Sequence, residues 1–333
     1  MNYLLLVGAG FTRNWGGWLS NEVFEYLLGC PEIRDDQFVH ELMWKWLGKG
    51  GFEYMLADVQ RHAVTNPTSE NKSRLASVNA AVSRMLADMN SSIIKGSLEF
   101  QIANSAAWIG SFLSRFNAIF SLNQDLFFEH HYLSITFSMP YYGQWAGHEL
   151  PGMKVAPGQE PFDWQSWGRQ TWQPATPTEF LLRENHQPLF KLHGSANWKD
   201  SSGRNLLVMG GDKSSAIRRE PVLAWYAEKF DAMLCNENTR LMIIGYGFLD
   251  PHINMAIEKA ISHHGLQIFN ISPEGGEHAR RVNTTRVPGL VTEPTSLEYA
   301  FEKGLIGASR RPLNQIFGAD ETERKKLFRF FEH

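Results

Sequence analysis

The chain has 333 residues and a formal net charge of −3, and its 43% hydrophobic residues can bury one large core or one core with a helical appendage. This weak negative charge provides no positive field, so we expect no direct nucleic-acid binding. Two cysteines are too few for a disulfide framework or a four-cysteine zinc site, which indicates a reducing compartment.

The first seven residues are apolar, but the segment is short and has no basic leader, and it runs directly into Gly8. These features predict a buried strand rather than a signal peptide. No later window approaches the roughly 18 unbroken apolar residues of a membrane span. We therefore expect a cytoplasmic protein that makes no membrane contact.

Short apolar runs recur along the chain, with helical stretches between them. This alternation predicts an α/β fold with a Rossmann-like, mainly parallel sheet flanked by helices. The predicted strands are Tyr3–Val7, Ala118–Ser121, Leu189–Leu192, Leu206–Met209, Leu241–Ile244 and Gln267–Ile271.

Three segments depart from this alternation inside what we expect to be one domain over residues 1–333. Apolar residues at helical spacing predict a helical insertion over about residues 20–115. Residues 141–178 carry tryptophans among Gly, Pro and Gln without periodicity, which predicts a long ordered loop that could serve as a lid. Charges mixed with aromatic residues over about 295–333 predict a helical tail that docks on the core or on another subunit.

A glycine turn follows the first predicted strand, at the place where a Rossmann phosphate loop belongs. Glycines such as Gly8 and Gly10 let the backbone approach a pyrophosphate, and the next helix supplies N–H donors. Arg13 replaces the third glycine of the dinucleotide fingerprint, and no second strand ending in an acid follows within about twenty residues. An ordinary dehydrogenase is therefore disfavoured, and a tight turn without any ligand stays open as an alternative.

Polar or small residues follow the other predicted strands at the carboxyl edge, where open α/β sheets bind ligands. These residues are Asn123, Asp125, His193, Gly245 and Asn270. Two of them have a structural alternative, because Asp125 can cap a helix and a histidine beside a glycine is more often structural than catalytic. Since the strand ends meet at one edge, we expect these residues to line one crevice.

The order and chemistry of these motifs resemble the sirtuin family and its bacterial sirtuin-like relatives. That family has a G-A-G-x-S loop, a T-Q-N-I-D segment, an H-G pair, a G-T-S segment and a late asparagine. The counterparts here are Gly8-Ala9-Gly10-Phe11-Thr12, Ser121-Leu122-Asn123-Gln124-Asp125, His193-Gly194, Gly245-Tyr246-Gly247 and Asn270. The resemblance covers residues 1–275, and residues 11–18 look like divergent sirtuin-like proteins of bacterial antiphage systems.

One departure from the family concerns zinc. Sirtuin deacylases carry a four-cysteine zinc ribbon after the histidine, next to the channel for acyl-lysine, whereas this chain has only Cys235 after His193. Similar proteins without the ribbon are typically NAD hydrolases of phage defence, often paired with a HerA-type ATPase. The resemblance therefore implies an NAD glycohydrolase that binds no zinc or other metal and consumes NAD as its substrate, giving nicotinamide and ADP-ribose.

The resemblance also implies a role for each site residue. Asp125 holds the carboxamide of nicotinamide, Asn123 positions water and the ribose hydroxyls, and His193 acts as general base, a role that suits a neutral imidazole with a pKa of roughly 6.5. The implied NAD contacts are Gly8, Ala9, Gly10, Phe11, Thr12, Asn123 and Asp125, with Gly245, Tyr246 and Asn270 on the adenosine half.

Two other functions stay open at this point, an NAD-dependent protein deacylase and a non-enzymatic subunit that senses NAD or ADP-ribose. A nuclease has the least support, because no acidic cluster is typical of a metal site. An unrestrained NADase would deplete its own cell, so we expect gated activity. The expected form is a homo-oligomer of low activity that an ATPase partner or a phage-derived signal activates.

Overall fold

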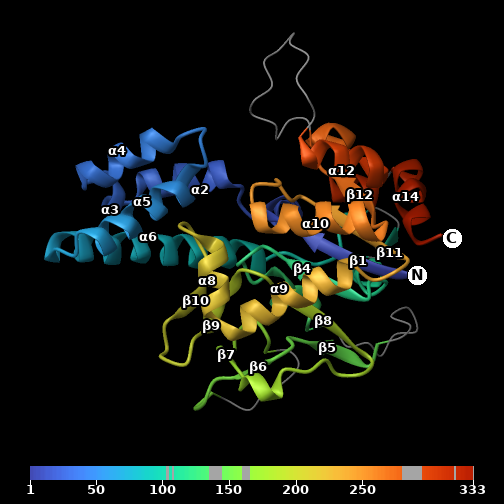
Figure 1. Ribbon diagram of the computed structural model, residues 1–333, viewed down its shortest axis with the longest axis horizontal. Coiled ribbons are helices and arrows are strands. Elements are labelled where there is room, and N and C mark those ends of the chain that lie inside the picture. Colours follow the sequence, from blue (N-terminus) through green and yellow to red (C-terminus); the bar gives the residue numbers. More distant parts are fainter. Residues whose placement is uncertain are drawn as a thin grey trace, which may run out of the picture.

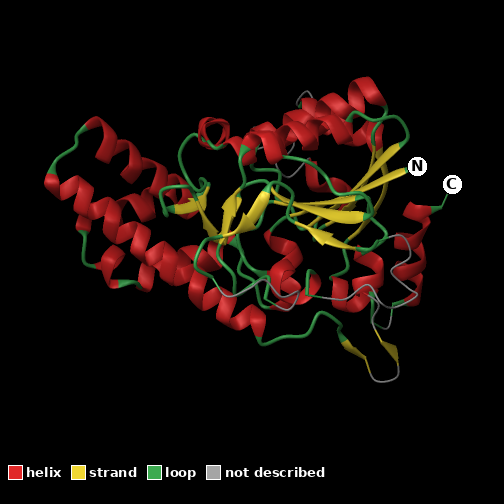
Figure 2. Ribbon diagram, turned by 90° about the horizontal axis from the view of Figure 1, so that it is seen from below, coloured by secondary structure: helices red, strands yellow, loops and turns green. Residues whose placement is uncertain are grey.

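The computed structural model places a seven-stranded sheet at the centre of the molecule, with helices on both of its faces (Figure 1, Figure 2). The predicted α/β class and Rossmann-like, mainly parallel sheet are confirmed. The structure describes residues 1–102, 105–106, 109–134, 145–159, 166–279, 295–318 and 320–332.

The strand order of the main sheet reverses beside its central strand, β1. In spatial order the strands are β13 (Leu305–Ser309), β12 (Gln267–Ile271), β11 (Thr239–Ile244), β1 (Asn2–Val7), β4 (Ala118–Ser121), β8 (His186–Lys191) and β5 (Gly147–Glu149). All neighbouring pairs are parallel. After β1 the chain builds one side of the sheet through β4 and β8, and it returns through β11 to build the other. Open α/β sheets bind ligands at such a switch point.

The central strands are buried on both faces, which is why they appear in the sequence as unbroken apolar runs. Residues 4–7 of β1 and residues 241–243 of β11 have no exposed surface. A strand covered by helices on both sides needs an apolar side chain at every position. Burying each such side chain contributes about 1.5–3 kcal/mol. These strands therefore form the centre of the hydrophobic core.

Five helices extend from the sheet as a separate lobe (Figure 1). They are α2 (Ser20–Gly29), α3 (Pro31–Arg34), α4 (Gln37–Trp46), α5 (Gly51–Thr65) and α6 (Ser69–Ile94). In α4, Val39, Leu42 and Met43 recur at helical spacing and face the interior of the lobe. The remainder of the predicted helical insertion holds two short strands, β2 (Gln101–Ile102) and β3 (Ser105–Ala106), and helix α7 (Ile109–Leu113).

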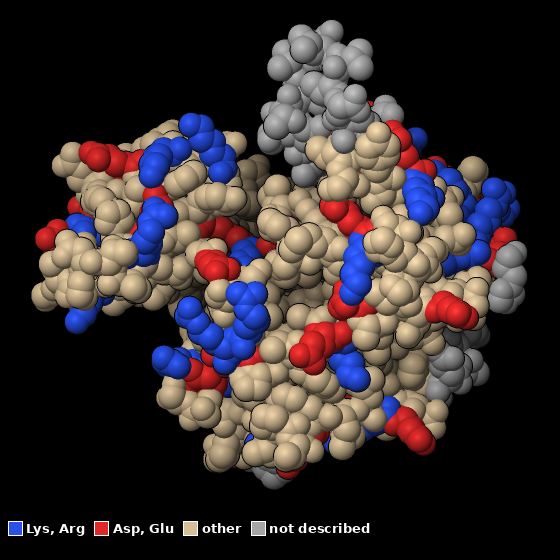
Figure 3. All heavy atoms as spheres, in the orientation of Figure 1, with Lys and Arg blue, Asp and Glu red and all other residues tan. Residues whose placement is uncertain are grey.

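Helices α8 (Lys213–Arg219) and α9 (Pro221–Leu234) precede β11, and α10 (Pro251–His264) connects β11 to β12. Both α9 and α10 begin with proline, which suits the first helical position because its missing N–H is not needed there. Gly265 ends α10 in the left-handed conformation, at φ 69°. On the face shown in Figure 3, basic and acidic side chains are interspersed, and the surface is hollowed between the lobe and the rest of the molecule.

The tryptophan-rich segment differs from the long loop that the sequence predicts. Its described part contains β5, which joins the main sheet, and the strands β6 (Met153–Val155) and β7 (Trp172–Pro174). Trp167 and Trp172 are buried and stack with ring centroids 5.0 Å apart, whereas Trp164 lies outside the described residues. Strands of three residues are too short to show alternation, so their sequences carry no strand signal.

A second sheet has the strand order β10-β9-β7-β6, where β9 is Gly194–Lys199 and β10 is Asn205–Leu207. The predicted strand at Leu206–Met209 therefore exists, but it lies in this sheet and not in the main one. Apolar periodicity identifies a buried strand without saying which sheet it joins.

The sequence predicts a helical C-terminal segment, but the structure places a strand within it. Between α12 (Ser296–Gly304) and α13 (Leu313–Ile316), β13 pairs in parallel with β12. Its sequence includes glycine and alanine, which are depleted in strands, so its amino-acid pattern does not predict a strand. Helix α14 (Glu321–Phe328) follows, and the Tyr3 hydroxyl in β1 donates to the carbonyl of Phe331 at 2.9 Å.

Candidate active site

Two glycine turns meet at the switch point, one after β1 and one after β11. The Gly10 N–H donates to the carbonyl of Gly245 at 2.9 Å. A Cβ on Gly8 would lie 2.7 Å from that carbonyl oxygen, and a Cβ on Gly10 would lie 2.8 Å from the Gly245 Cα. Gly245 itself has φ +64°, and its Cβ would collide with the Gly10 backbone. The contact between the two turns therefore requires all three glycines.

The same contact occupies backbone donors that a phosphate loop would offer. The Gly10 N–H is bonded to Gly245, and the Phe11 N–H donates to the carbonyl of Gly8 at 2.9 Å inside the short helix α1 (Ala9–Thr12). In a dinucleotide loop such N–H groups face the pyrophosphate. A tight turn thus accounts for the glycines by itself, and phosphate binding by residues 8–12 stays a prediction.

Asn123 joins the first turn to the end of β4. Its Nδ2 donates to the carbonyl of Gly8 at 3.0 Å and to Oγ1 of Thr12 at 3.3 Å, and its backbone N–H donates to Oγ of Ser121 at 3.1 Å. Asn123 and Thr12 are both buried. These bonds fix the Asn123 side chain in one orientation, which is the kind of preorganisation that substrate positioning needs.

Asp125 is buried beside the same turn. Its Oδ1 accepts a hydrogen bond from the Phe127 N–H at 3.0 Å, which is an Asx turn and agrees with the structural alternative for this residue. Burial raises the pKa of Asp125, while the positive charge of Lys191 and a hydrogen bond with Thr12 act in the opposite direction. Asp125 therefore stabilises its own turn and contacts the turn after β1.

A buried ion pair lies behind Asp125. Lys191 Nζ, at the end of β8, lies 2.8 Å from Glu129 Oε1, donates to Ser195 Oγ at 2.8 Å, and also donates to the carbonyl of Asp125. The Ser195 hydroxyl donates to Glu129 at 2.7 Å. Glu129 belongs to a π-helical turn, Phe128–Tyr132. Buried charges are tolerated when they are paired and hydrogen-bonded, so this cluster holds the Asp125 backbone in place.

His193 follows β8 and is only 2% exposed. Gly194 after it has φ 77°, and a Cβ there would collide with the carbonyl of Leu206, so the turn requires glycine. Burial lowers the pKa of His193 to about 3, with Lys213 acting in the same direction. The ordinary value near 6.5 expected from the sequence therefore does not apply, although the ring is neutral at pH 7.

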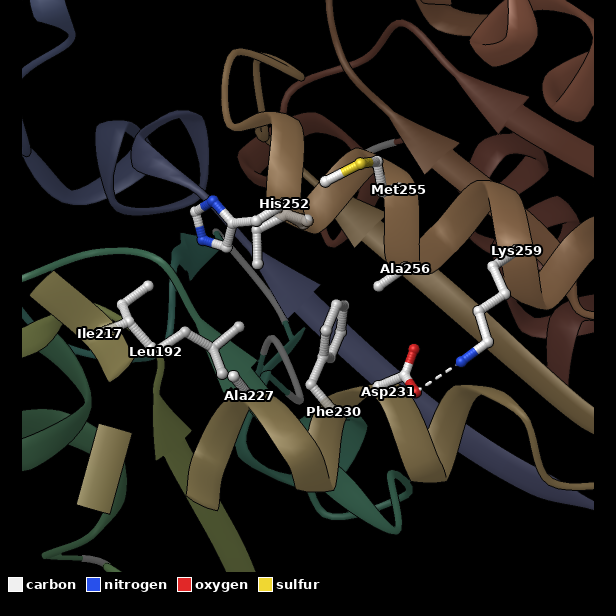
Figure 4. Close-up of a pocket in the computed structure, with 10 residues that line it drawn as sticks. Leu192, Ile217, Ala227, Phe230, Asp231, His252, Met255, Ala256 and Lys259 are labelled. Atoms are coloured by element: carbon white, nitrogen blue, oxygen red, sulfur yellow. Dashed lines mark hydrogen bonds and ion pairs between the residues drawn. The ribbon is translucent and has the colours of Figure 1, made fainter. Parts of the chain in front are cut away.

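Nε2 of His193 contacts a second histidine. His252, in the first turn of α10, places its Nε2 3.3 Å from Nε2 of His193. His252 also lines a cavity of about 250 Å³ between α9 and α10, whose wall is mostly apolar and includes Phe230 (Figure 4). The Asp231–Lys259 ion pair, at 2.8 Å, lies at the other end of this cavity.

Lys213 connects this part of the site to the helical lobe. Its Nζ lies 2.8 Å from Asp250 Oδ1, just before α10, and 2.6 Å from Glu53 Oε2 in α5. Burial acts against its charge, but the two carboxylates outweigh it and raise the pKa of Lys213. Lys213 therefore stays protonated and joins α5, α8 and the start of α10.

Tyr246 and Asn270, which are expected to contact the adenosine half, form hydrogen bonds with residues close to them in the sequence. The Tyr246 hydroxyl donates to Asn254 Oδ1 at 2.9 Å and accepts from the Asp250 N–H at 3.1 Å, which fixes the start of α10. Asn270 is fully buried, and its Nδ2 donates to the carbonyl of Gly275 at 2.8 Å. Its Oδ1 has no partner among the described residues. Contact with adenosine stays a prediction for both.

The structure thus brings part of the predicted set together. Gly8, Thr12, Asn123 and Asp125 form one hydrogen-bonded group, whereas Asn270 lies apart in β12, where it bonds to Gly275. Several further polar residues that surround this set were not assigned from the sequence: Glu53, Glu129, Lys191, Ser195, Lys213 and His252. Lys191 could have been noticed in the sequence because it ends an apolar strand. A buried lysine is rarely without a partner.

The chain matches the model of one protein family. The model of the SIR2-like domain matches residues 117–286, which is about half of the chain and includes Asn123, Asp125 and His193. No curated protein matches the chain. Among the described residues, no group of three or more His, Cys, Asp or Glu side chains could hold a metal ion. None of the described helices is long and apolar enough to span a membrane.

Proposed function

This chain belongs to the family of SIR2-like domains, and we propose that it is an NAD hydrolase that cleaves the bond between nicotinamide and ribose. SIR2-like domains use NAD. The observation that carries the proposal is the buried group formed by Asn123, Asp125 and Thr12 at the switch point, with His193 at the end of the next strand. The products are nicotinamide and ADP-ribose.

Cleavage of the bond between nicotinamide and ribose requires little acid catalysis by the protein. Nicotinamide is already cationic in NAD and departs as a neutral molecule, while the ribose passes through an oxocarbenium-like state. The protein must orient the ribose, exclude bulk water and help one water molecule to attack. A buried, hydrogen-bonded site at the carboxyl edge of the sheet suits these requirements.

Each residue has a role in this proposal. Asn123 is fixed by Gly8 and Thr12, and its carboxamide positions the attacking water and the ribose hydroxyls. Asp125 hydrogen-bonds the carboxamide of nicotinamide, and the Lys191 cluster behind it keeps its backbone from moving. His193 is neutral at pH 7, which suits a role as general base in the attack by water.

We propose further that the protein works in the cytoplasm as an antiphage effector that depletes NAD when a partner activates it. The resemblance to sirtuin-like defence proteins supports this role and a HerA-type ATPase as the partner. The helical lobe exposes roughly half of the surface of Trp44, Leu47 and Tyr54. Exposed apolar side chains of this kind suit a contact with another subunit, either in a homo-oligomer or with the ATPase.

The test is nicotinamide release from NAD by the purified protein, alone and with the product of its genomic neighbour. Asn123→Ala should lower the rate by a hundredfold or more, on the order of 3 kcal/mol in the barrier, with the fold retained. Asn236→Ala is the matched control, because Asn236 is exposed after α9 at the other edge of the sheet. Equal rates for Asn123→Ala and wild type would contradict the assignment.

The same assay separates the alternatives. Turnover of an acyl-lysine peptide together with NAD would indicate a deacylase. Binding of NAD or ADP-ribose, measured by calorimetry, without any release of nicotinamide would indicate a sensor. Light scattering reports the oligomeric state, and a monomer that hydrolyses NAD at full rate without its neighbour would contradict the proposed gating.

A further inference from the structure

Two imidazole rings face each other at the carboxyl edge of the sheet. Nε2 of His193, after β8, and Nε2 of His252, in α10, lie 3.3 Å apart. His193 is 2% exposed, whereas His252 is only partly buried and lines the cavity beside α9 (Figure 4). Of the two rings, His252 is therefore the one that small molecules can reach.

The hydrogen bonds of His193 determine where the protons lie on both rings. Burial lowers the pKa of His193 to about 3 and also lowers the pKa of His252, so both rings are neutral at pH 7. His193 also hydrogen-bonds the backbone of Leu122, and a carbonyl acceptor requires an N–H donor. With Nε2 directed at His252, that donor is Nδ1 of His193.

The Nε2 atom of His193 is then an acceptor, and the 3.3 Å contact requires His252 to donate its own Nε2–H. The neutral His252 ring consequently has a lone pair on Nδ1, and the described residues give this atom no hydrogen-bond partner. Both nitrogens of His193 are occupied by protein groups. An attacking water cannot reach the His193 lone pair while His252 stays in place.

We propose, on the basis of the proposed NAD hydrolysis, that His252 is a catalytic residue and the point at which the proton of the attacking water enters the histidine pair. The water oxygen forms a bond to the anomeric carbon of the ribose, and the bond from that carbon to nicotinamide breaks with its electrons going to the ring nitrogen. The water gives its proton to Nδ1 of His252. The Nε2 proton of His252 moves toward Nε2 of His193, and the proton leaves to solvent by the reverse path.

Charged groups around the pair determine whether it can hold this extra proton. Asp250, two residues before His252, favours a positive charge on both rings, whereas Lys213 opposes it. Glu53 lies 2.6 Å from Lys213 and offsets part of that opposition. The arrangement resembles a catalytic triad in its logic, because each hydrogen bond fixes the tautomer of the next group.

The experiment compares His252→Ala and His252→Gln with wild type in the nicotinamide-release assay. Glutamine keeps an N–H donor for His193 but has no basic nitrogen, so it separates proton transfer from simple positioning of His193. Both variants should lose about a hundredfold in kcat with little change in KM for NAD. Added imidazole should restore part of the activity of His252→Ala. His263→Ala is the matched control, because His263 is exposed at the other end of α10.

Each outcome decides the question. Full activity of His252→Gln overturns proton transfer and leaves His252 as a positioning residue, and full activity of both variants removes His252 from the reaction. If wild type releases nicotinamide in either case, the proposed function stands. A wild-type protein that releases none, alone or with its neighbour, overturns the proposed function and the role of His252 with it. Circular dichroism verifies folding, and the glutamine variant carries the test if the alanine variant unfolds.

Discussion

The two halves of the carboxyl edge are held together by different forces. Where the turns after β1 and β11 meet, the contact is backbone against backbone and depends on Gly8, Gly10 and Gly245. At the ends of β4 and β8, by contrast, the contact consists of buried polar and charged side chains, including Asp125 and Lys191. Close backbone packing therefore stabilises the half at β1 and β11. Hydrogen bonds and ion pairs stabilise the half at β4 and β8.

The largest effect should come from breaking the charged half. Lys191→Met leaves Glu129 buried without its counter-charge, and we expect a loss of about 3–5 kcal/mol in the free energy of unfolding. Urea denaturation measures this loss. The double variant Lys191→Met with Glu129→Leu should recover most of it, because neither charge is then left alone.

An exposed ion pair provides the control for Lys191. Lys325 and Glu321 lie 2.9 Å apart on α14 and are both largely exposed. Lys325→Met should change the free energy of unfolding by about 0.5 kcal/mol or less. If both lysine variants lose the same small amount, the charged half does not depend on the buried pair.

A smaller effect should come from the half that depends on shape. Gly245→Ala forces a left-handed backbone on alanine and drives its Cβ into the Gly10 backbone, so we expect a loss of about 3 kcal/mol. Gly247→Ala is the matched control, because its Cβ would lie 3.7 Å from Leu249 in ordinary contact. Thermal unfolding of the two variants should differ clearly, and equal melting temperatures would show that the turn contact can relax.

The smallest of the three effects is a pH dependence that belongs to the charged half alone. The pKa of His193 is about 3 in the folded protein and about 6.5 when unfolded, so the folded state binds fewer protons between these values. The resulting stability is fully present above pH 6.5 and falls as the pH is lowered. At pH 5 the loss from this one group is on the order of 2 kcal/mol.

His193→Gln should remove this part of the pH dependence, so its free energy of unfolding should fall less than that of wild type between pH 7 and pH 5. His263→Gln, at an exposed position, should keep the wild-type dependence. Urea denaturation at the two pH values tests both variants. Parallel curves for wild type and His193→Gln would mean that His193 takes up a proton as easily in the folded state as in the unfolded one.

The sequence predicts the central strands well, because a strand buried on both faces must be apolar throughout, as β1 and β11 are. It misses β13 at the edge of the main sheet, where Gly307 and Ala308 weaken the strand pattern. It also misses β6 and β7 of the second sheet, which have three residues each. Edge and satellite strands are held by their neighbours in space more than by their own composition.

The site shows the same limit for a different reason. Asn123 and His193 could be predicted because each directly follows a strand, and strand ends meet at one edge. The side-chain pairs around them could not be predicted, since Lys191 pairs with Glu129 across 62 residues and His193 pairs with His252 across 59. The sequence assigns the glycines to the approach of a phosphate, which stays a prediction, and it gives no sign of the contact between two turns that also requires them.

The position of β1 between β4 and β11 also determines when this protein can assemble during synthesis. Asn2 and Thr239 are 237 residues apart and yet hydrogen-bond at the start of neighbouring strands. A chain leaving the ribosome must therefore keep one side of its central strand unpaired until β11 has been made. Until then it carries Asn123 and His193 but not the turn contact that completes the switch point. The high contact order of the fold thus delays the finished site until β11 has been synthesised.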